Sequence, residues 1–154
     1  MRTRTRRSAR RGVAATEAAL VLPVFLALVL GTIDLAVAVS RSNTLSHAAR
    51  QGARHSMVHG SLATTGSTGG PWGPAPIDEP ATAAGVPAVD AVRPMLANCP
   101  LDESRVRVEW PDGSNAPGKR VRVTVTTTYR PMVTFLFGNP AIRLTASSTM
   151  PIAH

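Results

Sequence analysis

The chain has 154 residues, enough for one domain or for one domain with a membrane segment, and its net charge of +8 comes from 17 basic and 9 acidic residues. Six arginines fall within residues 1–12 (MRTRTRRSARRG), so the rest of the chain has 11 basic against 9 acidic residues. A basic nucleic-acid-binding domain is therefore excluded, and an aromatic content of 4% argues against a base-stacking surface. With Cys99 as the single cysteine, the chain has no internal disulfide and no thiolate zinc cluster.

Residues 1–12 form a basic leader, and the apolar residues 13–39 predict a transmembrane helix. The uncharged stretch inside it, residues 18–33, reaches only about 24 Å as a helix, whereas a bilayer core is about 30 Å thick. The span must therefore include residues beyond Glu17 or Asp34, and we expect both carboxylates near the membrane interfaces. The positive-inside rule places the N-terminus in the cytoplasm and the C-terminal part outside it. Pro23 is expected to kink the helix.

Three interpretations of this segment remain open from composition alone. The helix is a permanent single-pass anchor; or it is a secretory signal peptide that is cleaved after Ala38, at the Ala36-Val37-Ala38 site; or a leader is removed on the cytoplasmic side and the helix stays on the mature protein. The second interpretation would release a soluble secreted binding protein.

Three motifs favour the third interpretation. They are RRGVAATEAALVLP at residues 10–23, GTIDL at 31–35 and AARQGAR at 48–54. In this order they resemble TadE-like proteins, the pilin-like minor pseudopilins of tight-adherence (Flp-class, type IV) pilus systems. The chain departs from the family pattern at Ala18, where phenylalanine is usual, and at Gln51, where glutamate is usual.

The resemblance implies a non-enzymatic, single-pass protein of the bacterial inner membrane whose leader is cut between Gly12 and Val13 by a prepilin peptidase. A glycine leaves the scissile backbone accessible, and the arginines hold it at the anionic leaflet. Glu17 would then meet the new N-terminal amine of a neighbouring subunit, which offsets the cost of a carboxylate among apolar helices. The implied partners are the peptidase, other pilin or pseudopilin subunits, the pilus assembly platform and membrane lipids, with no nucleic acid. Asp34, by contrast, is expected to be a polar residue at the outer interface.

The remaining chain predicts an extracytoplasmic α+β domain. Residues 40–59 have small apolar residues at helical spacing and extend the first helix as an amphipathic helix, while Arg50 and Arg54 fall on another face. Residues 60–87 form a Gly/Pro-rich loop, whose Trp72 is either a loose surface aromatic or, as we expect, a plug over the fold. Within 88–154, a short helix is predicted at 88–98, and alternating residues predict strands at 105–110, 120–129 and 142–150. We expect a pilin-like architecture in which the amphipathic helix covers one face of a small antiparallel sheet.

No arrangement of residues predicts catalysis, a metal site or a cofactor. His55 and His59 are four residues apart, but no helix-borne carboxylate completes a ligand set, so a solvated helix face is the simpler interpretation. The acidic pairs at 78–79 and 102–103 are only neighbours in loop-like sequence. Cys99 has no activating neighbour in the sequence and is expected to be a small buried hydrophobe.

Overall fold

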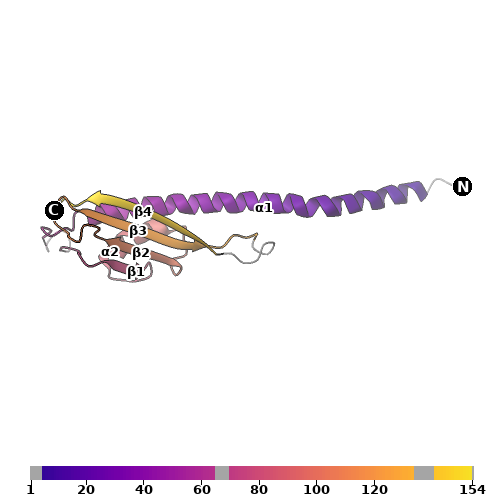
Figure 1. Ribbon diagram of the computed structural model, residues 1–154. Helices are drawn as coiled ribbons and strands as arrows, with labels where there is room; N and C mark the ends of the chain where they lie inside the picture. The colour runs from indigo at the N-terminus through magenta and orange to yellow at the C-terminus, as the bar shows by residue number, and fades with distance from the viewer. Residues whose placement is uncertain (1–4, 65–69, 134–140, 154) are drawn as a thin grey trace. The chain divides into compact units, whose positions relative to one another are not determined.

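The computed structural model describes residues 5–64, 70–133 and 141–153. Its elements in chain order are α1 (Thr5–Ser56), β1 (Ile77–Pro80), α2 (Pro87–Val92), the 3-10 helix η1 (Arg93–Leu96), β2 (Ser104–Glu109), β3 (Arg120–Tyr129) and β4 (Ile142–Pro151) (Figure 1). The chain divides into two compact units, which are described separately. One contains α1 up to Val37 and the first residues after Arg130; the other contains 38–130 and the chain from Ala141 onward. The predicted α+β class is confirmed.

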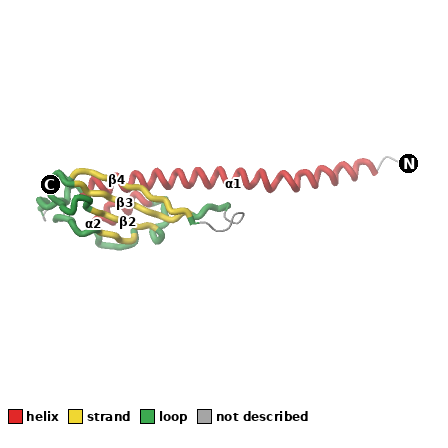
Figure 2. Tube along the Cα trace, in the orientation of Figure 1, coloured by secondary structure: helices red, strands yellow, loops and turns green. Residues whose placement is uncertain are grey.

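The second unit is built on one antiparallel sheet with the strand order β1-β2-β3-β4 (Figure 1), whose strands are yellow in Figure 2. Valines alternate with arginines and threonines along β2 and β3, so one face of the sheet is apolar and the other is polar. The register places Val106 opposite Val125 and Val108 opposite Val123, and all four are at most 1% exposed. These β-branched pairs form the centre of the core, as the alternation predicts.

The C-terminal part of α1 covers the apolar face of this sheet. Four residues of the predicted stripe are 0% exposed: Leu45, Ala48, Ala49 and Ala53. A Cβ atom on Gly52 would lie 2.7 Å from Val92 Cγ2 and 3.0 Å from Val123 Cγ1, so the small residues allow the helix backbone to approach β3 and α2 closely. Arg50 and Arg54 are exposed on another face, as the sequence predicts.

The helix predicted at 88–98 is present in two pieces. Pro87 begins α2, a favourable position because the first turn of a helix does not use its N–H groups. The α-helical geometry ends at Val92, and η1 continues around Pro94, which cannot donate the next hydrogen bond. The ion pair between Asp90 and Arg93, 2.9 Å long, spans the junction.

Strand β1 was not predicted: it lies inside the segment 60–87, which the sequence describes as a loop. Its four residues, IDEP, end in a proline and contain one strongly apolar side chain, Ile77. As an edge strand it pairs only with β2, from Ile77 opposite Val108 to Pro80 opposite Arg105. Proline is tolerated here because one side of an edge strand has no hydrogen-bonding partner. The pairing with β2, rather than the local sequence, therefore makes this segment a strand.

Candidate functional site

Most of the apolar part of α1 is not covered by the other residues that the structure describes. Within Val13–Ser56 the helix is long and apolar enough to cross a membrane: an 18-residue window of it has a mean hydropathy of 2.5, and only 6% of that window is buried. Leu20, Val24 and Leu35 are 78%, 70% and 66% exposed. A core helix of a water-soluble domain would bury such side chains, so this helix needs an apolar environment from elsewhere.

The predicted cleavage and assembly residues all lie on α1. The bond between Gly12 and Val13 falls within the helix, and Pro23 is also inside it. Glu17 follows Val13 by four residues, so the two lie on the same side of the helix. The Glu17 side chain is exposed, and no other described side chain pairs with it. Cleavage at Gly12 and the pairing of Glu17 remain predictions.

Asp34, which is expected at the outer membrane interface, has backbone partners in the structure. It is 6% exposed, and its two carboxylate oxygens accept hydrogen bonds from the backbone amides of Met132 (2.9 Å) and Val133 (2.8 Å). These amides belong to the connection between β3 and β4, 98 and 99 residues further along the chain. An acid at the end of an apolar run is visible in the sequence, but a backbone partner so distant is not.

Three basic side chains and one glutamine line a hollow on the exposed face of α1. His47, Arg50, Gln51 and Arg54 surround a volume of about 250 Å³. They recur at intervals of three or four residues and therefore form one stripe of the helix. The sequence predicts this solvent-facing arginine face but not the hollow.

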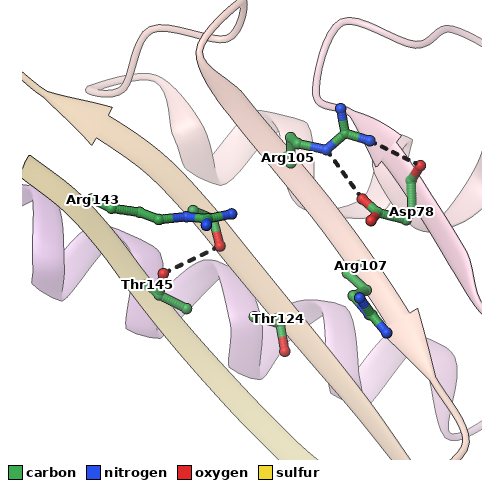
Figure 3. Close-up of a pocket in the computed structure, with 7 residues that line it drawn as sticks. Asp78, Arg105, Arg107, Thr124, Arg143 and Thr145 are labelled. Carbon is green, nitrogen blue, oxygen red and sulfur yellow. Dashed lines mark hydrogen bonds and ion pairs between the residues drawn. The ribbon is translucent and has the colours of Figure 1, made fainter. Parts of the chain in front are cut away.

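A second hollow, of about 350 Å³, lies on the polar face of the sheet (Figure 3). It is lined by Asp78, Arg105, Arg107, Thr124, Thr126, Arg143 and Thr145. Arg105 donates to the Asp78 carboxylate at 3.1 Å, and the hydroxyls of Thr126 and Thr145 lie 3.3 Å apart. The arginine at 107 is also engaged, by Glu109 at 3.2 Å. Much of the positive charge around this hollow is therefore already neutralised by neighbouring acids.

The prediction that both histidines occupy a solvated face is wrong for His59. His59 is 3% exposed, and its ring stacks on Trp72 with 4.0 Å between the centroids. The His55 ring lies 4.8 Å from His59 and 5.5 Å from the indole. Burial, and then the neighbouring His59, lower the pKa of His55 below its ordinary value. The predicted plug, Trp72, is 8% exposed and belongs to the core, so the histidine pair packs under it.

Neither Cys99 nor the acidic residues form a reactive constellation. Cys99 is buried, as expected, and burial raises the pKa of its thiol, although the nearby positive charge of Arg41 opposes the change. Of the two sequence-adjacent acidic pairs, Asp78 binds Arg105 and Glu103 binds Arg130. Within the described residues, no three His, Cys, Asp or Glu side chains could hold a metal ion together.

The described helix sequence is similar to a known family. Residues 12–54 match the TadE-like protein family. The resemblance that the three motifs indicate is thus confirmed over residues 12–54, which include the apolar stretch and the stripe from Leu45 to Ala53 that packs on the sheet. No curated protein and no solved structure matches the chain significantly. The TadE-like match lies entirely within α1 and does not extend to the sheet.

Proposed function

We propose that the protein is a TadE-like pseudopilin, a non-enzymatic membrane-anchored subunit that acts in assembly of a tight-adherence (Flp-type) pilus or a related secretion apparatus. The observation that carries this proposal is the exposed apolar stretch of α1, which precedes a folded domain and lies within the TadE-like match. Such a helix can be buried in lipid before assembly and against sister helices afterwards. The proposed location is the inner membrane, with the domain outside the cytoplasm.

The proposed maturation step is cleavage between Gly12 and Val13 by a prepilin peptidase. The six arginines before this bond would hold it at the cytoplasmic membrane surface. Cleavage would remove the charge block and leave an apolar helix that starts with the amine of Val13. Glu17, exposed one turn later, would accept that amine from a neighbouring subunit.

A second candidate is a secreted binding protein released after Ala38. It is supported by the position of the unit boundary, since the second compact unit begins at Ala38. Two features count against it. Ala36-Val37-Ala38 lies in the middle of the continuous helix α1, and cleavage there would remove Asp34 and its hydrogen bonds to Met132 and Val133.

The intact mass of the membrane-extracted protein tests these alternatives. We expect a mature chain that lacks residues 1–12 and begins at Val13. Loss of residues 1–38 would support the secreted protein, and a full-length chain would indicate an unprocessed anchor; either result would overturn the proposed maturation. A Gly12→Val variant should block the cleavage, whereas Gly31→Ala, at a helix position with no atom within 4 Å of the added Cβ, should not.

A further inference from the structure

Asp34 and the first residues after β3 satisfy each other's polar groups. Asp34 is 6% exposed although its neighbours Ile33 and Leu35 are 47% and 66% exposed. Its carboxylate accepts the amides of Met132 and Val133 at 2.9 and 2.8 Å, and these two residues form a turn in the same compact unit. These hydrogen bonds stabilise both groups, because burying an unpaired carboxylate or an unpaired backbone amide away from water costs free energy.

The segment held by Asp34 has the composition of a lipid-contacting surface. Met132 is 71% exposed, and no charged residue occurs between Arg130 and Arg143 in the sequence. Because the hydrogen bonds of Asp34 hold this turn against α1, the exposed Met132 belongs to the same compact unit as the exposed apolar stretch of the helix. Non-helical backbone is compatible with the edge of a bilayer only if its polar groups have partners, and Asp34 supplies partners for two of them.

We propose that Asp34 clamps the start of the β3–β4 connection at the outer surface of the bilayer, so that Met132 contacts phospholipid beside the membrane helix. The protein then has two lipid contacts, the helix and this turn. This inference rests on the proposed membrane anchorage and names a positioning role for Asp34. The occupant is lipid because Asp34 ties the turn to a helix that is apolar enough to cross a membrane, and because the exposed side chain of Met132 is apolar and uncharged.

The test uses single cysteines in the full chain, with the buried Cys99 replaced by alanine. A nitrobenzoxadiazole label is placed at Val24→Cys on the helix, at Met132→Cys on the turn, or at Leu62→Cys as a matched control. Leu62 is similarly apolar and 69% exposed, but it follows the C-terminal end of α1, and Asp34 lies about 33 Å of helix before that end. Each protein is inserted into vesicles of phosphatidylethanolamine and phosphatidylglycerol that contain a lipid with a headgroup-level or a mid-chain nitroxide.

We expect the headgroup-level nitroxide to quench the label at position 132 several-fold more strongly than the label at 62, and the mid-chain nitroxide to quench position 24. Asp34→Ala should reduce quenching at 132 several-fold and leave position 24 unchanged. Thr32→Ala, a matched substitution on the same helix, should change neither.

Each other outcome overturns one part of the proposal: the second lipid contact, the role of Asp34 or the membrane anchorage. If position 24 is quenched while 132 resembles 62, the second lipid contact is wrong and the membrane helix stands. If 132 is quenched equally in Asp34→Ala, the clamping role of Asp34 is wrong. If position 24 is not quenched either, the proposed membrane anchorage itself fails. Quenching at 132 that disappears as the protein-to-lipid ratio rises would assign the surface to a second copy of the chain and overturn the lipid assignment.

Discussion

At the scale of single residues, packing against Trp72 determines the environment of His55 and His59. His59 is buried against Trp72, and its Nδ1 lies 2.7 Å from the carbonyl oxygen of His55. His55 remains on the rim of this cluster. Two histidines four residues apart could share a metal ion, but here both rings pack against the indole of Trp72. The pair therefore contributes to the stability of the domain.

Protonation of His55 is expected to destabilise the domain. Because the pKa of His55 is lowered, the unfolded chain takes up the proton more readily, so the contribution of the neutral ring is complete above its ordinary pKa of 6.5 and is lost as the pH falls through the lowered value. Since the ring is largely exposed, we expect the Tm to fall by only about 1–3 °C between about pH 7.5 and 5.5. Thermal unfolding followed by circular dichroism measures this change.

The control for this prediction is a second histidine on α1. His55→Gln should remove most of the pH-dependent fall in Tm, whereas His47→Gln, a substitution at an exposed position, should retain it. An identical fall in the wild type and in His55→Gln would show that another group is responsible.

Helix α1 combines two surfaces with different requirements. Up to about Val37 it exposes large apolar side chains, and from Leu45 to Ala53 it buries small ones against the sheet. Small residues reduce the distance between the helix and the valines of β3, and at Gly52 an added Cβ would lie only 3.0 Å from Val123 Cγ1. The AARQGAR motif at residues 48–54 is thus explained by packing, with its arginines on the exposed face.

Gly52→Leu tests this packing. The new side chain would meet Val92 and Val123, both of which are fully buried, and overpacking typically costs about 1–3 kcal/mol. Unfolding by urea in detergent solution should therefore show a free energy of unfolding lower by that amount. Gln51→Leu, at the adjacent exposed position, should change it by less than about 0.5 kcal/mol. Equal effects of the two substitutions would contradict close packing at Gly52.

Hairpin β2–β3 shows how exposed charges fix an element locally. Asp112, in the turn after β2, accepts the backbone N–H of Arg120 at 2.9 Å and pairs with its guanidinium at 2.7 Å. These bonds lower the pKa of Asp112 from 3.8 to about 2. The pair therefore supports the start of β3 above about pH 4 and is lost as the pH falls towards 2. Because it is exposed to water, its role is to set the geometry of the turn.

At the scale of the whole molecule, the proposed function depends on Glu17 meeting a neighbouring subunit. We expect Glu17→Gln to leave leader removal unchanged, because the substitution lies beyond the cleaved bond. Filament assembly should fall about tenfold or more, because a hydrogen bond to a charged group contributes about 1.5–3 kcal/mol. Intact mass measures processing, and quantitative electron microscopy of surface filaments measures assembly.

The matched substitution is Thr16→Val, next to Glu17 on the same helix. It should leave both processing and assembly close to wild type, since Thr16 donates to its own helix at Val13. Normal filament assembly by Glu17→Gln would rule out the paired carboxylate.

The sequence by itself determined the features that depend on neighbours along the chain. The apolar stretch of α1 follows from its uninterrupted apolar composition. The small-residue stripe from Leu45 to Ala53 and the alternation of β2 and β3 follow from periodicity, because a helix or strand repeats its facing direction at a constant interval. Together with the three motifs, these patterns also predicted the α+β class and the TadE-like match.

Only the tertiary structure decided the features that need a distant partner. The short strand β1 forms because β2 offers it an edge, His59 is buried because Trp72 folds over it, and Asp34 is satisfied by amides 98 and 99 residues away. A short polar strand, a histidine or an acid has no periodic pattern that identifies its partner. Its environment is set by which segments the folded chain brings together.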